Sequence, residues 1–210
     1  MMSIISKAMA DSSISLVDKE LRASHAGETG AVWIYRGALT ADFLVSVVAG
    51  LWAKLSPKTQ SRKEEEKQKT EGSVCSFASE HLATEKNHLD IFENHMPPFR
   101  GSYMLLLWMV AGFMTGFLPR ILGRNWFFYT IYCVEYFVDE HYEEQCGLLE
   151  SLDPTPFDVL EKFRQCQSDE QGHRDEAYNA MTTPPTRAMK LWGNMVGKGS
   201  AIAVVMAKKI

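Results

Sequence analysis

The chain has 210 residues, which is enough for one domain with a substantial hydrophobic core and is large for a simple helical bundle. Its formal net charge of −4, from 22 basic and 26 acidic residues, gives no electrostatic case for binding nucleic acid. The four cysteines form no C-x-x-C pair and therefore indicate neither a disulfide framework nor a zinc site.

The predicted elements are all helices. Apolar residues recur at steps of three and four, and no alternating strand pattern lies between turn signals, so the predicted fold class is all-α. We expect a single domain over residues 14–210, preceded by a flexible N-terminus at residues 1–13 that is at most a weak transit peptide. The predicted helices cover residues 14–55, 74–96, 103–117, 124–150, 156–181 and 187–208.

A charged, low-complexity stretch separates the first two predicted helices. Its sequence is SPKTQSRKEEEKQKTEGS, residues 56–73, and its composition fits either a solvated helix or a loose loop. We interpret the wider segment of about 44–72 as an insertion into the domain and assign no chemistry to it.

Two later segments are unusually apolar for a soluble domain. Residues 103–119 contain about 16 apolar or small residues before Pro119, fewer than the roughly 20 that span a bilayer. Residues 126–138 are rich in aromatic side chains. Both segments are either core helices or helices that lie in a membrane interface. The second interpretation predicts lipid contact for Trp108, Phe113, Phe117 and Phe127.

Glu135 interrupts the second of these apolar segments. On a helix it lies among Ile131, Val134 and Val138. A carboxylate in such surroundings costs free energy unless it is paired or bound to a metal ion. The sequence therefore predicts a partner for Glu135.

Two Glu-x-x-His pairs occur in the chain, Glu85 with His88 and Glu170 with His173. Residues three apart lie on one face of a helix, so both side chains of a pair can reach the same metal ion. One pair alone is weak support, because it is as readily a solvated polar face or a simple hydrogen bond.

Two further glutamates strengthen the metal hypothesis. Carboxylate di-iron bundles use one Glu from each of two helices and a Glu-x-x-His from each of two others. Here Glu28 lies on the first predicted helix and Glu135 on the fourth, so the order is Glu, Glu-x-x-His, Glu, Glu-x-x-His. Carboxylate and imidazole donors suit iron or manganese. A helical module that carries these residues on its surface remains the alternative.

Five ordered motifs resemble the demethoxyubiquinone hydroxylase family, the di-iron monooxygenases of ubiquinone biosynthesis. The motifs, all within residues 20–180, are HAGETGA, EKNHLDIF, LLLWMVAGF, VEYFVDEHYEEQ and DEQGHRDEA. The resemblance implies a ferritin-like four-helix bundle with additional membrane-interfacial helices at 103–117 and 187–208. It also implies a catalytic role for His141 and Tyr142, near the quinone or in passing electrons and protons. The implied ligands of two iron ions are Glu28, Glu85, His88, Glu135, Glu170 and His173.

The resemblance further implies an enzyme that hydroxylates the ring of a polyprenylated demethoxyquinol with dioxygen. Two electrons would come from a donor such as NADH or a reductase, and the other implied partners are membrane lipid and a lipid-binding accessory protein. The implied location is the matrix face of the mitochondrial inner membrane, or the cytoplasmic face of a bacterial inner membrane. Two alternatives stay open, a rubrerythrin- or ferritin-type iron oxidase and a non-catalytic membrane-associated helical module.

The chain departs from the family pattern in its insertion and at Tyr136, where the family often has a second Glu beside the ligand. The remaining histidines have weaker assignments. His81 could be a third ligand, but we expect it to support a ligand or to lie at the surface. His25 precedes Glu28 by three residues and could hydrogen-bond to it, and His95 is expected at a helix end.

Overall fold

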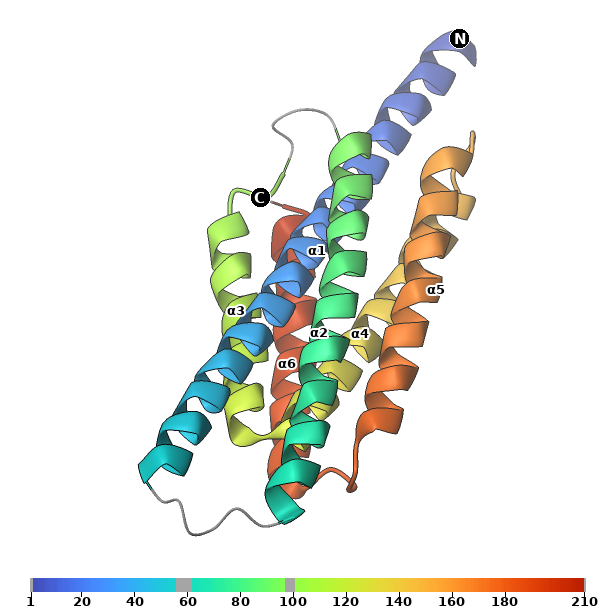
Figure 1. Cartoon of the computed structure of the whole chain (residues 1–210). Helices are drawn as coiled ribbons and strands as arrows, with labels where there is room; N and C mark the ends of the chain where they lie inside the picture. The colour runs from blue at the N-terminus through green and yellow to red at the C-terminus, as the bar shows by residue number, and fades with distance from the viewer. Residues whose placement is uncertain (1, 56–61, 97–100, 210) are drawn as a thin grey trace.

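The computed structural model describes residues 2–55, 62–96 and 101–209, and within them the side chains of 16–52, 74–96 and 101–209. These residues form six helices and no strand, which confirms the all-α prediction. The helices are α1 (Met2–Leu55), α2 (Arg62–His95), α3 (Leu105–Leu122), α4 (Arg124–Glu150), α5 (Phe157–Ala180) and α6 (Arg187–Ala207). Helices α1, α2, α4 and α5 form the bundle, and α3 and α6 pack against α1 and α4 (Figure 1).

Several helix boundaries differ from the predicted ones. Helix α1 starts at Met2 because residues 2–13 contain no Gly or Pro that would stop it, while the flexibility predicted for this segment is untested. Much of the charged insertion is helical, since α2 starts at Arg62. Helix α3 continues past the predicted end at 117 to Leu122. Pro119 lies in its last turn, where the missing N–H removes only one intrahelical hydrogen bond.

The interior of the bundle has three layers, and on each core helix the residues of successive layers are seven positions apart. One apolar cluster contains Leu21, Phe92, Tyr142 and Phe163, and a second contains Tyr35, Ala78, Phe128 and Ala177. Seven residues make two helical turns, so a residue midway between these positions faces the same interior. On every core helix that midway residue is a buried glutamate, which creates a polar layer inside the bundle: Glu28, Glu85, Glu135 and Glu170.

Helix α3 lies unusually close to α1 because it presents glycines to it. A Cβ added at Gly112 would lie 2.2 Å from the Gly30 carbonyl oxygen, and one at Gly116 would lie 1.8 Å from that of Ile34. The Gly112-x-x-x-Gly116 spacing puts both glycines on one face of α3. No larger residue fits there, so the sequence of α3 is specific for this backbone contact.

The one charge near the end of α3 is neutralised inside the protein. Arg120 is buried, and its Nε donates to Asp42 Oδ1 of α1 at 2.8 Å. The outer face of α3 therefore presents apolar side chains, which continue onto the end of α1 and onto α6. This apolar face comprises Phe43, Val48, Leu51, Trp52, Leu106, Leu107, Val110, Met114, Leu118, Leu122, Ile202 and Val205.

The predicted lipid contact of Phe127 is wrong. Its side chain is fully buried in the core of the bundle, where it packs edge-on against Phe77 at a centroid distance of 6.0 Å. Trp108, Phe113 and Phe117 are half-buried. By length and composition, Leu16–Trp52 and Leu105–Leu122 could each cross a membrane, a test that core helices of soluble proteins also pass.

Candidate metal centre

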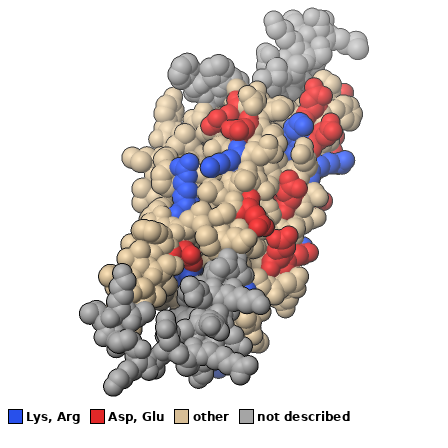
Figure 2. Space-filling view, viewed as in Figure 1, with Lys and Arg blue, Asp and Glu red and all other residues tan. Residues whose placement is uncertain are grey.

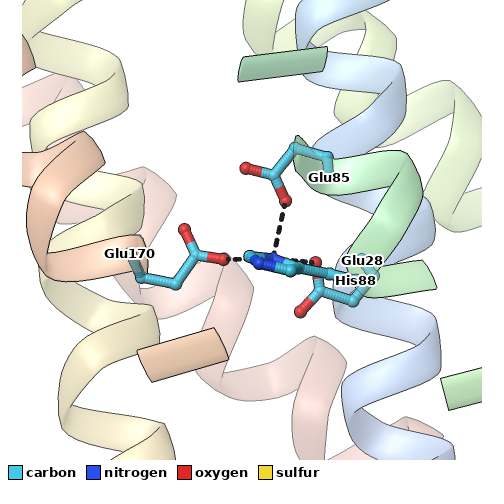
Figure 3. A group of neighbouring side chains, drawn as sticks. All are labelled: Glu28, Glu85, His88 and Glu170. Carbon is cyan, nitrogen blue, oxygen red and sulfur yellow. Dashed lines mark hydrogen bonds and ion pairs between the residues drawn. The ribbon is translucent and has the colours of Figure 1, made fainter. Parts of the chain in front are cut away.

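Six side chains from the four core helices converge in the polar layer. Figure 3 shows four of them pointing toward one another: Glu28 from α1, Glu85 and His88 from α2, and Glu170 from α5. A second, overlapping group consists of Glu85, Glu135, Glu170 and His173. In each group the candidate ligand atoms lie within 4.8 Å of one another. The two groups share two glutamates, so the geometry offers two neighbouring cation positions joined by two carboxylates.

All six residues that the sequence singled out as ligands are therefore brought together. Glu85, His88 and Glu170 are at most 1 % exposed, so the alternative of surface residues is wrong for them. Their role as ligands remains a prediction.

His88 is held at both of its ring nitrogens. Its Nδ1 donates to Glu170 Oε1 at 3.0 Å, and its Nε2 lies 3.0 Å from Asp169 Oδ2. Nδ1 also lies 3.7 Å from Glu28 and 3.8 Å from Glu85. A carboxylate on the outer nitrogen fixes the orientation of an imidazole whose inner nitrogen faces a metal position. Asp169 is this carboxylate for His88.

His173 mirrors this arrangement at the other position. Its Nδ1 lies 3.1 Å from Glu170 Oε2 and 3.2 Å from Glu85 Oε1. Glu170 thus holds one imidazole with each of its carboxylate oxygens. This bridging position is the one expected of a carboxylate shared by two cations.

Burial and hydrogen bonds set the charges in the cluster. Burial raises the pKa of Glu85 and of Glu135 well above the usual range, and the charge of Glu170 raises both further. Burial also opposes ionisation of Glu170, but bonds from His173 and His88 outweigh it and lower its pKa to about 2. Burial alone would lower the pKa of both imidazoles, yet their bonds to Glu170 raise it. The cluster thus holds protons that a cation would displace.

The donor set fits a pair of divalent cations. Both oxygens of Glu85 are buried and lack a hydrogen-bond partner among the described residues. An unsatisfied buried carboxylate is costly, whereas a bound cation would satisfy it. Four carboxylates and two neutral imidazoles also balance the charge of two divalent ions.

Two buried tyrosines hydrogen-bond the two glutamates of α1 and α4, Glu28 and Glu135. The hydroxyl of Tyr142 on α4 donates a hydrogen bond to Glu28 of α1. The hydroxyl of Tyr35 on α1 donates one to Glu135 of α4 at 3.2 Å. Each tyrosine follows the glutamate of its own helix by seven residues and bonds the glutamate of the other. Burial raises the pKa of both hydroxyls well above the usual range, so they remain donors.

An apolar cavity of about 330 Å³ lies beside the cluster, enclosed by α1, α3, α4 and α6. The glutamates Glu28, Glu135 and Glu170 form part of its wall, and most of the remaining wall is apolar, including Trp108. Met195 of α6 also lines the cavity and is 56 % exposed, so the cavity reaches the surface. An apolar molecule can therefore approach the cluster from this side.

The structure places His141 and Tyr142, the predicted catalytic pair, in the wall of this cavity. The His141 ring stacks on Phe137 at 6.0 Å, and its buried Nε2 has no hydrogen-bond partner among the described residues. Burial lowers the pKa of His141 to about 4, and the nearby charge of Lys208 adds to this effect. His141 is thus a neutral imidazole with an unused ring nitrogen.

The other residues considered from the sequence lie outside the cluster. Tyr136 is 47 % exposed, and its side chain does not lie beside the predicted ligands. His25 does not bond Glu28 and lies 3.6 Å from Glu93, because α2 runs antiparallel and brings that residue alongside. His95 is exposed at the end of α2, as predicted.

His81 has one of the two locations expected for it, beside a predicted ligand. It is 5 % exposed and belongs to neither metal group, so a surface location is wrong. Its Nε2 lies 3.1 Å from Glu176 Oε2 of α5, and its ring packs edge-on against His173 at 4.0 Å. It therefore supports a predicted ligand by contact.

Sequence reasoning missed Tyr35 and Asp169. Tyr35 had a usable signal, since it follows Glu28 by seven residues as Tyr142 follows Glu135. Asp169 had none, because its contact with His88 joins α5 to α2 and depends on how these helices pack.

Residues 64–207 match the family described as Ubiquinone biosynthesis protein COQ7. The match covers more than half of the chain and includes five of the six cluster residues, all except Glu28. The chain belongs to this family. The family expected from the five motifs is confirmed.

Individual relatives align over most of the chain. The NADPH-dependent 3-demethoxyubiquinone 3-hydroxylase, mitochondrial, of Mus musculus is 26 % identical over 198 residues, which cover 92 % of this chain and 77 % of the relative. The protein of the same name from Caenorhabditis elegans is 27 % identical over 201 residues, covering 93 % and 91 %. The 3-demethoxyubiquinol 3-hydroxylase of Rhodospirillum rubrum is 27 % identical over 199 residues, covering 93 % and 79 %.

Proposed function

We propose that the protein is a di-iron monooxygenase of ubiquinone biosynthesis, which hydroxylates the ring of a polyprenylated demethoxyquinol, demethoxyubiquinol. The observation that carries the proposal is the contact between the buried glutamate–histidine cluster and an apolar cavity that reaches the surface. The cluster offers hard oxygen and imidazole donors, and the cavity suits an apolar ring. Family membership and the names of the relatives support the same reaction.

The residues of the cluster divide into bridging and terminal ligands. Glu85 and Glu170, which belong to both groups, would bridge the two ions. The terminal ligands would be Glu28 with His88 at one position, and Glu135 with His173 at the other. When bound, the iron pair supplies the means to activate dioxygen. In the net reaction one oxygen atom enters a ring C–H bond, and the other leaves as water after uptake of two electrons and two protons.

The chain's own residues would position the ring and keep the site dry. Tyr142 and Tyr35 hold the terminal carboxylates by hydrogen bonds and restrict their rotation. Trp108 and Val138 contribute apolar side chains to the wall of the cavity. His141 lines the cavity, and a rotation of its ring would bring the buried, unpartnered Nε2 to a ring oxygen of the substrate. This last contact would fix which ring carbon faces the cluster.

The apolar face around α3 would place the protein on a membrane. The cavity reaches the surface between α3 and α6, so an isoprenoid tail could remain in lipid while the ring enters. We propose the matrix face of the mitochondrial inner membrane as the location, in line with the names of the eukaryotic relatives; a bacterial host would use the cytoplasmic face. Part of the same face could receive a lipid-binding accessory protein. NADPH is the proposed electron source, after the mouse relative's name.

A ferritin- or rubrerythrin-type iron oxidase remains the second candidate for the same ligands. That activity requires only iron and an oxidant at the cluster. It gives no role to an apolar cavity whose wall contains His141 and Tyr142. The cavity therefore favours hydroxylation of an organic substrate.

The test is single-turnover hydroxylation with isotopic oxygen. Iron-loaded protein is mixed with a short-chain demethoxyquinol, NADPH and ¹⁸O₂, and the product is examined by mass spectrometry. We expect a product heavier by one ¹⁸O atom and none with a Glu170→Ala variant. Rapid oxidation of ferrous ion without a hydroxylated quinol would instead assign the protein to the iron oxidases.

A further inference from the structure

A second hollow, the polar cleft, reaches the cluster from the side opposite to the apolar cavity. It has a volume of about 440 Å³ and lies between α2 and α5. Figure 2 shows acidic side chains gathered over these two helices. Among the residues that the structure describes, none of those lining the cleft is Lys or Arg. The side chains that matter are Glu80, His81, Asp169, His173 and Glu176.

The inner end of the polar cleft touches one candidate histidine ligand and the carboxylate that holds the other. His173 lies in its wall, while the Nδ1 of this residue faces the carboxylates of Glu85 and Glu170. Asp169 also lines the cleft and contacts the outer nitrogen of His88. The cleft is therefore bounded at this end by a residue of the cluster itself, His173.

His81 adds an imidazole to the wall of the cleft. This residue is 5 % exposed and lines the cleft, and its Nε2 is paired with Glu176. Its Nδ1 is buried and has no hydrogen-bond partner among the described residues. That nitrogen is closed off, but Nε2 and the Glu176 carboxylate lie together in the wall of the cleft, and such a pair can bind a passing cation.

The two hollows differ in what they can admit. A hydrated divalent ion that entered the apolar cavity would have to lose water along a mostly apolar wall before it reached the glutamates, which is costly. The polar cleft replaces that water step by step with carboxylate oxygens and a ring nitrogen. We propose that the polar cleft is the entry route for ferrous ion, with Glu80 and Glu176 attracting it and His81 binding it in passing. This inference rests on the proposed metal centre.

Two glycines provide a matched test. Gly172 lines the polar cleft and Gly199 lines the apolar cavity, and a Cβ at either position would meet nothing within 4 Å. A helical side chain covers the turn before it, so Phe at 172 would lie over Ser168 and Asp169 of the cleft. Phe at 199 would likewise cover Met195 of the cavity.

Cobalt(II) added to the whole protein without oxygen serves as the probe, followed by visible absorption. We expect Gly172→Phe to load cobalt several-fold more slowly than wild type and Gly199→Phe to load at the wild-type rate. Both variants should reach about two cobalt ions per chain, as a Glu₄His₂ site requires. A slow Gly199→Phe, or a Gly172→Phe that loads as fast as wild type, would overturn the proposed route.

Removal of charge provides a second, independent test. A Glu80→Gln, Glu176→Gln double variant should load about three- to tenfold more slowly at low ionic strength, and added salt should shrink this difference. Glu161→Gln removes an exposed charge elsewhere on α5 and should change nothing. Equal rates for the double variant and this control would also overturn the route. A wild-type protein that binds no cobalt would defeat the metal centre itself, which separates the two failures.

Discussion

Each of the two sides of the cluster carries two glutamates, but the surroundings of the two sides differ. On the α1–α4 side, Glu28 and Glu135 are held by tyrosine hydroxyls and face an apolar cavity. On the α2–α5 side, Glu85 and Glu170 contact the two histidines, and beyond them lies the polar cleft. The extra helices α3 and α6 pack on the first side, so the second is left to solvent (Figure 1).

This difference separates two requirements of the proposed reaction. An organic ring needs dry walls, because water beside the cluster would compete with the ring for the reaction. Ions and charged groups need polar partners at every step. A bundle with four equivalent helices cannot offer both, and the asymmetric placement of α3 and α6 can.

The largest expected effect comes from removing Glu170, the proposed bridging ligand, together with His173. A Glu170→Ala, His173→Ala double variant loses two donors, so bound iron after anaerobic loading should fall from about two per chain to well below one. Elemental analysis measures this directly. His95→Ala, which alters a surface histidine at the end of α2, is the control and should retain normal iron. Normal loading in the double variant would remove both residues from the ligand set.

Lipid binding tests the other side of the comparison. Val110 and Met114 are exposed on the outer face of α3, and a Val110→Asp, Met114→Asp double variant should lose most binding to phosphatidylcholine liposomes. Phe157→Asp, on the α5 side and 73 % exposed, should float with liposomes like wild type. Binding should persist in high salt, because burial of apolar area is not screened. Loss of wild-type binding in salt would point instead to the basic residues of 58–69.

The sequence was sufficient for the bundle because the same seven-residue step recurs on all four core helices. Glu28, Glu85 and Glu170 each have interior apolar residues seven before and seven after, and Glu135 follows the same rule. Period and residue type are local properties, so they can be recognised without coordinates. The prediction of the six candidate ligands rests on another local signal, the Glu-x-x-His spacing and the order of the glutamates, together with the family resemblance.

Contacts between helices could not be predicted in the same way. Phe127 lies in an aromatic run in which lipid-facing and core-facing residues have the same chemistry, so its burial depends on where α4 meets Phe77. His25 was assigned to Glu28 by spacing, but packing of α2 supplies Glu93 as its partner. The polar cleft was also beyond sequence reasoning, because its walls come from two helices far apart in the chain.

The tyrosines allow a finer comparison of the two metal positions. Tyr142→Phe and Tyr35→Phe each remove one hydroxyl and keep the ring, so iron content should stay near wild type. Quinol hydroxylation should fall several-fold in Tyr142→Phe, because Tyr142 borders the cavity. It should fall less in Tyr35→Phe, whose ring is enclosed by His81 and Phe77. Equal turnover in wild type and Tyr142→Phe would leave Tyr142 with a packing role only.

The smallest expected effect tests whether the apolar cavity excludes water. The pH dependence of the free energy of unfolding measures this through His141. Burial lowers its folded-state pKa to about 4, whereas the unfolded chain binds this proton near the ordinary histidine value of 6.5. Between these values the unfolded state holds the extra proton, so stability contributed by neutral His141 is lost as pH falls from 6.5 toward 4.

Replacing His141 by Gln removes this loss. In the metal-free protein, the free energy of unfolding of His141→Gln, relative to wild type, should improve by about 1–2 kcal/mol between pH 7.5 and pH 5. His81, whose pKa is lowered to about 3, titrates in the same direction but is present in both proteins, so it cancels from the difference. Denaturant unfolding at the two pH values gives the measurement. An unchanged difference would mean that His141 is hydrated, and the cavity would then lose the dryness that sets it apart from the polar cleft.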